Sequence, residues 1–389
     1  MKLFAFRESM LAGAFLFFSG ASVFGQTWTK TFSPTNDWQA VASSADGTKL
    51  VAVIPYARGI YTSTNSGASW TSNNVPSGEW FAVASSADGT HLIAAAYAGG
   101  SGIFTSTDSG ATWVSNTVPG TGWFSVASSA DGTNLLAVAG GGQFRGPICT
   151  STNGGGTWTS NNVAPDFWYS AASSADGTKL VAMAQSDYYT STNSGATWVS
   201  NSLNSVMWNA VACSADGTKL VAAALASGRH YLLTSTNSGA TWMTNSPPVG
   251  RTVAVASSAD GTKLIAVEEG VVWSSTNSGL SWASTNLAGF WLGAALSADG
   301  GRQAIGEGSP GEIWTSQTTT SPQMALAISG GVLIASWTVP STNFILEQSA
   351  DLISWSAVTN PAVFNVANLQ YQTSVAATNF DGFYRLATQ

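Results

Sequence analysis

Apolar and polar residues alternate along this chain in short runs that are separated by turn residues. In one representative stretch, Trp80–Ala87 ends at an Asp-Gly turn and is followed by an apolar run, His91–Tyr97. A glycine-rich connection then leads to Ile103–Thr107, and another turn leads to Ala111–Asn116. No apolar spacing of 3.6 residues accompanies these runs. The pattern therefore predicts four short antiparallel strands and no helix.

The same four-strand pattern is repeated seven times. The tripeptide Ala-Asp-Gly marks each copy, and successive copies are between 39 and 45 residues apart. A period of this length with four strands per copy is typical of a β-propeller blade. The acidic residues of the seven copies are Asp46, Asp88, Asp131, Asp176, Asp216, Asp260 and Asp299.

The two ends of the repeat array predict how the ring closes. The third strand of a copy is recognisable seven times, but a fourth strand follows only six of them, because the last copy ends in Thr318-Thr319-Thr320. The segment Thr27–Lys30 matches the fourth strand Thr112–Ser115. An N-terminal strand that completes the last blade would remove two exposed sheet edges. The predicted fold is all-β: a seven-bladed β-propeller over residues 26–320, closed by its N-terminal strand.

The segments outside the array have different patterns. Residues 1–25 are typical of a secretory signal peptide, with Lys2 and Arg7 before the apolar run Met10–Phe18 and small residues after it. Residues 321–389 alternate in a way that predicts a small β-sandwich-like domain, weakly similar to fibronectin-III-like modules of secreted bacterial proteins. We expect a bacterial protein that is secreted or held in the cell envelope, with an uncleaved membrane anchor as the alternative. No other segment is apolar for long enough to cross a bilayer.

Composition narrows the choice of partner. Charged residues make up only 8% of the chain, and the net charge is −7. Removal of residues 1–25 leaves eleven cations and nineteen anions, with no cluster of Lys or Arg, so we expect no nucleic-acid partner. Cys149 and Cys213 stand at unrelated repeat positions and are expected to be free, buried thiols. No metal cluster or phosphate loop is recognisable, and we expect no cofactor and a monomeric chain.

An eight-residue box lies between the third and fourth strands of six copies. It reads STNSGASW at Ser63–Trp70 and STDSGATW at Ser106–Trp113. The box resembles the Asp-box or BNR repeat, which occurs in sialidase-like, sortilin-like and photosystem-assembly-factor-like propellers, and that resemblance implies a fold rather than a reaction. We predict a structural role, in which the polar side chain bonds turn amides, Gly supplies a positive φ, and the Trp packs between sheets with its indole N–H on a carbonyl. The polar residues at this position are Asn65, Asp108, Asn153, Asn193, Asn237 and Asn277.

The connections on the opposite face of the predicted propeller differ between copies. Variable loops on a rigid scaffold usually carry function, so this variable face is the predicted binding face. Most of the scarce charge falls there, although solvated loops collect charge in any case. The basic residues are Arg58, Arg145, Arg229, His230 and Arg251, and the acidic ones are Asp166, Asp187, Glu268, Glu269 and Glu307.

A tryptophan begins the innermost strand of six copies, eight residues before the acidic residue of that copy, and Thr252 alone breaks the series. Such indoles could stack on sugar rings near the channel mouth. A feature repeated in nearly every blade is more often a packing element that wedges neighbouring blades together. Both interpretations stay open for Trp38, Trp80, Trp123, Trp168, Trp208 and Trp291.

The predicted function is a binding or interaction module that recognises a polysaccharide or a protein through the variable face. The alternative is a glycoside hydrolase of the sialidase or glucanase type. A sialidase needs an arginine cluster, a Tyr–Glu pair and an acidic proton donor, and a glucanase needs paired carboxylates in a cleft. The repeat supplies neither set, so we name no catalytic residue. His91 is interpreted as a solvated residue, because Lys49, Lys179 and Lys219 occupy its place in other copies.

Overall fold

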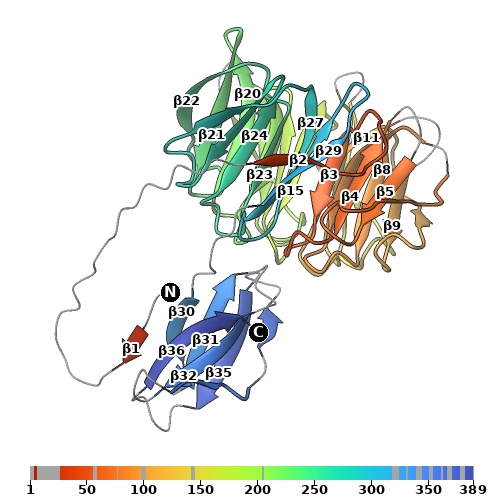
Figure 1. The fold of residues 1–389 in the computed structure, drawn as a ribbon. Coiled ribbons are helices and arrows are strands. Elements are labelled where there is room, and N and C mark those ends of the chain that lie inside the picture. The colour runs from red at the N-terminus through yellow and green to blue at the C-terminus, as the bar shows by residue number, and fades with distance from the viewer. Residues whose placement is uncertain are drawn as a thin grey trace.

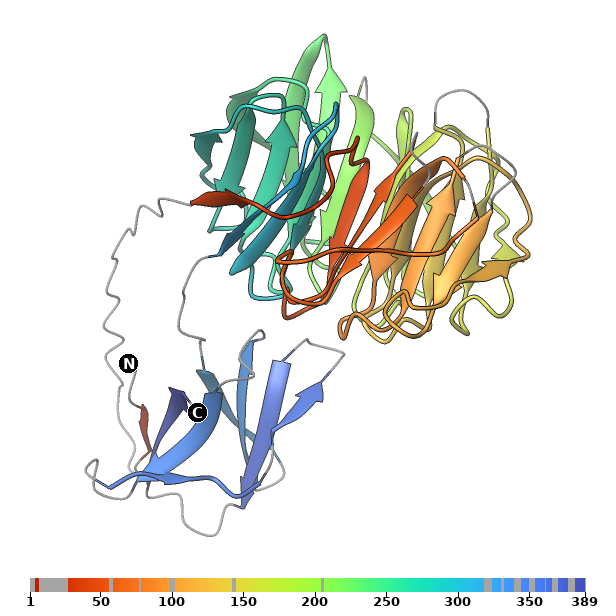
Figure 2. The ribbon, with the colours of Figure 1, turned by 45° about the vertical axis from the view of Figure 1, so that its right-hand side comes forward.

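The computed structural model is built from β-strands. It describes residues 4–6, 27–55, 59–76, 78–97, 102–141, 145–203, 206–317, 324–329, 332–338, 344–349, 354–360, 362–365, 370–376 and 382–388. Seven four-stranded sheets in this described part of the chain stand around a common axis, as Figures 1 and 2 show. The protein is therefore a β-propeller, and each sheet is called a blade below.

Each blade is an antiparallel meander whose first strand is innermost. Blade 1 holds β3 (Ala40–Ser43), β4 (Leu50–Ile54), β5 (Gly59–Ser63) and β6 (Thr71–Ser72); blade 2 holds β7 (Trp80–Ser85), β8 (Leu92–Ala96), β9 (Ile103–Ser106) and β10 (Val114–Asn116). Blade 3 holds β11 (Trp123–Ser128), β12 (Leu135–Ala139), β13 (Ile148–Ser151) and β14 (Thr159–Ser160); blade 4 holds β15 (Trp168–Ser173), β16 (Leu180–Ala184), β17 (Asp187–Ser191) and β18 (Val199–Ser202). Blade 5 holds β19 (Val206–Cys213), β20 (Leu220–Ala226), β21 (Arg229–Ser235) and β22 (Met243–Val249); blade 6 holds β23 (Ala254–Ser257), β24 (Leu264–Glu268), β25 (Val271–Ser275) and β26 (Ala283–Asn286).

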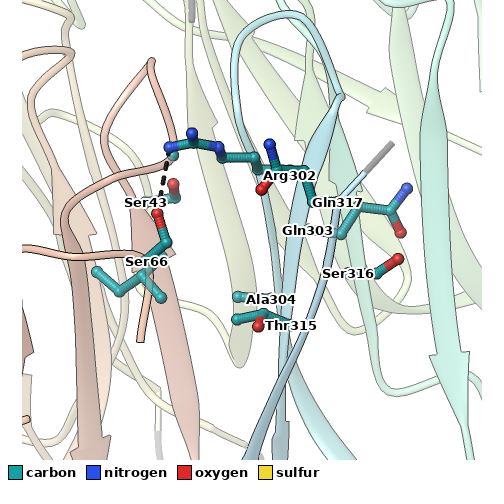
Figure 3. A pocket seen from close by; sticks show the side chains of 10 residues that line it. Ser43, Ser66, Arg302, Gln303, Ala304, Thr315, Ser316 and Gln317 are labelled. Carbon is teal, nitrogen blue, oxygen red and sulfur yellow. Dashed lines mark hydrogen bonds between the residues drawn. The ribbon is translucent and has the colours of Figure 1, made fainter. Parts of the chain in front are cut away.

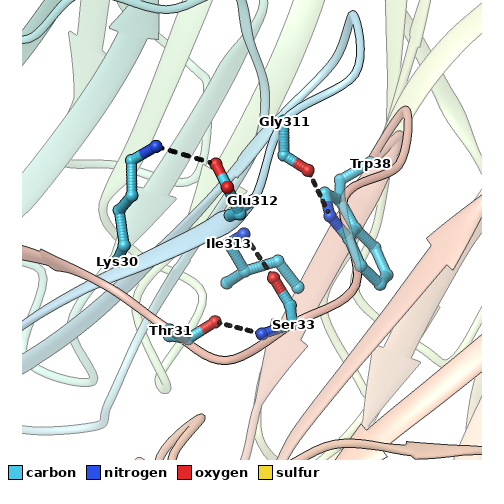
Figure 4. Close-up of polar contacts among 7 residues, drawn as sticks. All are labelled: Lys30, Thr31, Ser33, Trp38, Gly311, Glu312 and Ile313. Atoms are coloured by element: carbon cyan, nitrogen blue, oxygen red, sulfur yellow. Dashed lines mark hydrogen bonds and ion pairs between the residues drawn. The ribbon is translucent and has the colours of Figure 1, made fainter.

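Blade 7 confirms the predicted closure. It consists of β27 (Trp291–Leu296), β28 (Arg302–Glu307), β29 (Ile313–Gln317) and the N-terminal strand β2 (Trp28–Lys30), which pairs antiparallel with β29. Polar contacts extend the closure beyond the strand, as Figure 4 shows: Lys30 forms an ion pair with Glu312 at 3.0 Å, and the Ser33 hydroxyl accepts the Ile313 amide at 2.8 Å. The N-terminal segment thus enters the ring through side chains as well as through β pairing.

The turns that carry Ala-Asp-Gly, called the acidic turns below, are joined into a closed circle. The alanine N–H of each turn donates to the alanine C=O of the next turn at 2.7 or 2.8 Å, and the last turn returns to the first. These alanines also surround one end of the central channel. In order around the circle they are Ala45, Ala87, Ala130, Ala175, Ala215, Ala259 and Ala298.

A second set of contacts links the acidic turns, and residues at the repeat position of His91 make it. Lys179 donates to the Asp216 carbonyl and Lys219 to the Asp260 carbonyl, both at 2.8 Å, so each side chain reaches into the following blade. Lys263 and Arg302 make the corresponding contacts with the carbonyls of Asp299 and Asp46. In these four blades the position is therefore a clamp to the next blade.

The C-terminal strands form two further sheets. One has the order β30 (Met324–Ser329), β31 (Val332–Thr338), β35 (Gln370–Ala376) and β34 (Val363–Asn365). The other has the order β1 (Phe4–Phe6), β36 (Gly382–Thr388), β32 (Phe344–Ser349) and β33 (Ser356–Ala357). Leu333, Ala335 and Trp337 lie in their shared core, and Tyr371 packs against Ala45 and Ala298 of the propeller. Apart from β1, the predicted signal segment 1–25 lies outside the described residues.

The seam between blades 7 and 1 departs from the repeat in its core. Six blades place a leucine at the start of the second strand, at Leu50, Leu92, Leu135, Leu180, Leu220 and Leu264, whereas blade 7 has Gln303. Gln303 is 6% exposed, and its Oε1 has no hydrogen-bond partner among the described residues. The Ser316 hydroxyl also has no hydrogen-bond partner among the described residues. Both side chains line a cavity of about 90 Å³ with Arg302 and Ser66, drawn in Figure 3.

We predict that Gln303→Leu stabilises the protein, because it replaces an unpartnered buried amide by the side chain that six other blades carry. A gain of about 1–2 kcal/mol in the free energy of unfolding is expected in urea denaturation. The reciprocal control, Leu264→Gln, should destabilise by about 3 kcal/mol. A loss of stability in Gln303→Leu would contradict this account of the seam.

Candidate binding site at the channel mouth

The box turns are built by side-chain hydrogen bonds. In blade 1, Asn65 Oδ1 accepts the Ser69 amide at 2.8 Å and the Ser63 hydroxyl at 3.0 Å, and Asn65 Nδ2 donates to the Ser69 hydroxyl. Asn153, Asn193, Asn237 and Asn277 repeat this pattern. In blade 2 the direction of one bond reverses, and the Thr112 hydroxyl donates to Asp108 at 2.6 Å. Asn and Asp side chains therefore hold this turn together by equivalent hydrogen bonds.

Other details of the box prediction are only partly met. Gly67 has a φ of 88°, as expected, but Ser66 before it also has a positive φ of 57°. The Trp113 indole N–H donates to the Gly110 carbonyl. Trp70 instead donates to the Thr31 hydroxyl. The indole nitrogens of Trp158, Trp198, Trp242 and Trp282 are buried without a partner among the described residues, so the predicted carbonyl contact is not general.

The six tryptophans of the inner strands are buried. Each has at most 1% of its surface exposed, and each packs in the apolar cluster between neighbouring blades. Some also donate their indole N–H to a loop carbonyl, as Trp168 does to Gly146 at 2.8 Å. With no exposed ring face, these residues cannot stack on a ligand in this structure. As ligand candidates, Trp38, Trp80, Trp123, Trp168, Trp208 and Trp291 are corrected to packing residues.

The arginines of the variable face do not form one cluster in the described structure. Arg145 is exposed and lies 5.3 Å from the centre of the Phe167 ring, and Arg229 is exposed at the start of β21. Arg251 lines the mouth of the central channel. Arg58 lies outside the described residues. Only Arg251 therefore takes part in the site described next.

The residue after each tryptophan points into the channel mouth. In five blades the ladder between the first and second strands shifts its register at this residue, which is Phe81, Phe124, Tyr169, Asn209 or Leu292. A β-bulge re-aims the side chain of its extra residue. All five line a hollow of about 490 Å³ around the axis on the variable face, together with Gln39 and Val253 at the equivalent positions.

Aromatic side chains occupy one side of this hollow. Phe81 and Phe124 lie with their ring centres 5.0 Å apart, and Tyr169 meets Phe124 edge to face at 6.1 Å. Tyr97 packs against both phenylalanines. We call Phe81, Tyr97, Phe124 and Tyr169 the aromatic crescent. Its members come from blades 2 to 4 and are half-buried, so they leave apolar surface open to a ligand.

The backbone is adapted to this crescent. Gly141 has a φ of 72°, and a Cβ there would collide with the Phe124 ring. The opposite wall is mixed, with the polar residues Gln39, Asn209 and Arg251 beside the apolar Val253 and Leu292. Arg251 is the one charged residue among the described residues that line the hollow. The site therefore joins an apolar surface to a single positive charge.

The candidate site lies on the face that the sequence predicted, but of the residues predicted as ligand contacts only Arg251 lines it. The position after the tryptophan carries six different residue types in seven blades while its neighbours barely change, and that variation was the available signal. In a regular strand, alternation alone sends this residue to the face opposite the buried indole. The bulge that directs it into the channel mouth has no marker in the sequence.

Other titratable groups fit a structural role. Cys149 and Cys213 are free, and burial raises their pKa values to about 11 and about 12. Cys149 is buried as predicted, whereas Cys213 is half-buried. No group of three or more His, Cys, Asp or Glu in the described chain could hold a metal ion. No helix among these residues is long and apolar enough to span a membrane.

Comparisons with known proteins show the fold. No family model matches the chain, and no curated protein matches it. Three solved structures that resemble it are YCF48 bound to D1 peptide, hydrazine synthase of Kuenenia stuttgartiensis, and the β-propeller domain of Cps50 (Swd1) from Myceliophteria thermophila. Their identities to this chain are 14%, 12% and 12%, with TM-scores of 0.58, 0.61 and 0.59. They cover 77%, 75% and 75% of this chain and 98%, 99% and 100% of their own. At these identities the likeness defines a propeller and no particular activity.

The acidic turns predict how stability depends on pH. Burial alone would raise the pKa of Asp46, but hydrogen bonds from Ser44 and Thr48 outweigh burial and hold that pKa below its usual value. Asp88, Asp131, Asp176, Asp216 and Asp260 behave alike, whereas burial prevails at Asp299 and raises its pKa. The six lowered carboxylates stabilise the fold above the unfolded pKa of about 3.9, and this contribution is lost as the pH falls through their folded values.

We expect Ser44→Ala to cost about 2 kcal/mol at neutral pH, because it removes a hydrogen bond to a carboxylate. Without that bond the pKa of Asp46 rises, so the midpoint of acid unfolding, followed by circular dichroism, should move to higher pH. Ser202→Ala, at an exposed serine of β18, is the matched control and should leave the midpoint unchanged. An unshifted midpoint in Ser44→Ala would refute this assignment.

Proposed function

We propose that this protein is a binding module whose ligand occupies the channel mouth on the variable face. The observation that carries the proposal is that bulged inner strands aim three members of the aromatic crescent, Phe81, Phe124 and Tyr169, at a hollow of about 490 Å³. Aromatic surface in a concave site with a few polar groups is the usual form of a ligand pocket. The ligand class is a polysaccharide or a polypeptide, since both present apolar faces to aromatic rings.

Two observations support binding over hydrolysis. The described lining of the hollow includes no Asp or Glu, whereas glycoside hydrolysis requires a pair of carboxyl groups across the scissile bond. YCF48, one of the propellers that resemble this chain, has been solved bound to a D1 peptide, so a propeller of this general fold can take a polypeptide. The hydrolase alternative is tested by turnover assays on sialosides and β-glucans.

Phe124→Ala and Tyr169→Ala should each weaken ligand binding at least tenfold, because each removes apolar contact area from the centre of the crescent. Ligands would first be identified on glycan and peptide arrays with the purified full chain, and affinities measured by titration calorimetry. Val199→Ala, at an exposed valine of β18, is the control and should bind as the wild type does. Unchanged affinity in both crescent variants would overturn the proposed site.

We also propose that the protein is exported to the cell envelope or the medium through residues 1–25. A charged start, a short apolar run and small residues support this proposal. Expression of the full chain in a bacterial host, followed by fractionation and measurement of the N-terminal mass, should give a mature chain that begins near Ser22 or Gln26. An unprocessed chain retained in the cytoplasm would contradict it.

A further inference from the structure

Blade 6 departs from the repeat at two positions that face each other across the first and second strands in other blades. Thr252 stands where the other six blades have the buried tryptophan. In blades 2 to 5 that tryptophan pairs across the strands with a small apolar residue, as in Trp80 with Ala96. In blade 6 the residue at this second position is Glu268. A bulky indole beside a small residue has been replaced by a small side chain beside a carboxylate.

The Glu268 carboxylate is buried and only partly satisfied. Glu268 is 5% exposed, and its Oε1 accepts the Trp273 indole N–H at 2.8 Å. Its Oε2 has no hydrogen-bond partner among the described residues. The Thr252 hydroxyl, on a side chain that is 1% exposed, and His230 Nδ1 are buried and unpartnered in the same way. Three groups able to accept hydrogen bonds are therefore buried without donors. The segment 249–252 links them, because His230 pairs with Val249 and Gly250 lies against Glu268 Oε2.

The charges around this group do not neutralise the carboxylate. The ion pair that the described residues contain is Lys30–Glu312, in blade 7, and Arg251 is exposed. The pKa of His230 is lowered by burial first and by Arg251 second, although Glu268 opposes the shift, so the imidazole is neutral at neutral pH. A buried carboxylate without a cation is costly.

The group adjoins the channel mouth. Thr252 and Arg251 line the hollow that faces the aromatic crescent. Gly250, which is exposed, lies over Glu268: a Cβ on this glycine would be 3.0 Å from Oε2. An exposed glycine therefore lies directly beside the buried carboxylate.

We propose that Glu268, Thr252 and His230 form a subsite for the ammonium or guanidinium group of a polypeptide ligand. Three acceptors match the three N–H donors of a lysine side chain, and the ligand's cation supplies the missing counter-charge. This subsite rests on the proposed function, since the rest of the ligand would lie against the crescent. A polypeptide fits better than a polysaccharide because Phe81 and Phe124 offer sugar hydroxyls no polar atom, and their ring faces are already partly packed.

The proposal is tested with an array of capped pentapeptides that carry two phenylalanines and a varied central residue, probed with the full chain. The wild type should select Lys or Arg at the centre over norleucine. Glu268→Gln should bind the lysine peptide at least tenfold more weakly while its affinity for the norleucine peptide is unchanged. Glu307→Gln is the matched control, because blade 7 has a glutamate at the same position beside Trp291. Arg251→Ala should strengthen binding of the lysine peptide, since it removes a like charge.

Several outcomes would overturn the subsite. These are no preference for a basic residue in the wild type, a preference retained in Glu268→Gln, or binding of chitosan oligomers in place of basic peptides. Thr252→Val provides a second variant should Glu268→Gln fail to fold, and its thermal melt and loss of lysine preference would be measured together. The proposed function fails separately: it requires that Phe124→Ala lose binding of lysine and norleucine peptides alike.

Discussion

The circle of hydrogen bonds between the acidic turns is the interaction on which the rest of the propeller depends. Each alanine in it uses both its N–H and its C=O in bonds to neighbouring blades. A blade that moves outward therefore breaks two bonds, each with a net value of about 1 kcal/mol. The circle also explains why alanine is present in all seven copies: the seven side chains share a hollow of about 150 Å³ at the end of the channel, and larger groups would crowd it.

Because of this constraint the two faces of the propeller differ. One face has nearly the same turns in every blade, and the other is the variable face. Acidic turns, clamps and box turns lie on one side of the blades, and their near-identical sequences serve the fixed spacing between blades. The inner strands extend from these turns to the variable face. The loops there do not set the spacing between blades, so their sequences can vary. On the variable face, a bulge after the tryptophan changes which side chain points into the channel mouth. In blade 6, Thr252 replaces the tryptophan and Glu268 replaces its small partner. These changes leave the circle of alanines intact.

Much of the fold could be predicted from the sequence because its information is repeated. The missing fourth strand after Ile313–Gln317 and the match at Thr27–Lys30 sufficed for the closure, and the alternation of polar and apolar residues sufficed for the strands. The short strand Val363–Asn365 was not predicted, since it has only three residues between turn residues. The alanine circle could not be predicted either, because it is made by backbone atoms across blades.

The candidate site was less accessible to sequence reasoning. A tryptophan that recurs in six blades attracts attention, yet burial removes it from any ligand, and the variable residue beside it is the one that reaches the channel mouth. The relation between Thr252 and Glu268 likewise emerges only when the strand register is known, since sixteen residues separate them in the chain.

The most direct test of this account is hydrogen–deuterium exchange at the seven alanine amides of the circle, measured on the intact chain in native buffer. Since these amides form one closed set, they should exchange together, at the slow rate set by global unfolding. The Ala298 amide donates to the Ala45 carbonyl across the junction of blades 7 and 1. Faster exchange at Ala298 alone would mean that the ring opens there, and would contradict the claim that the circle holds the propeller together.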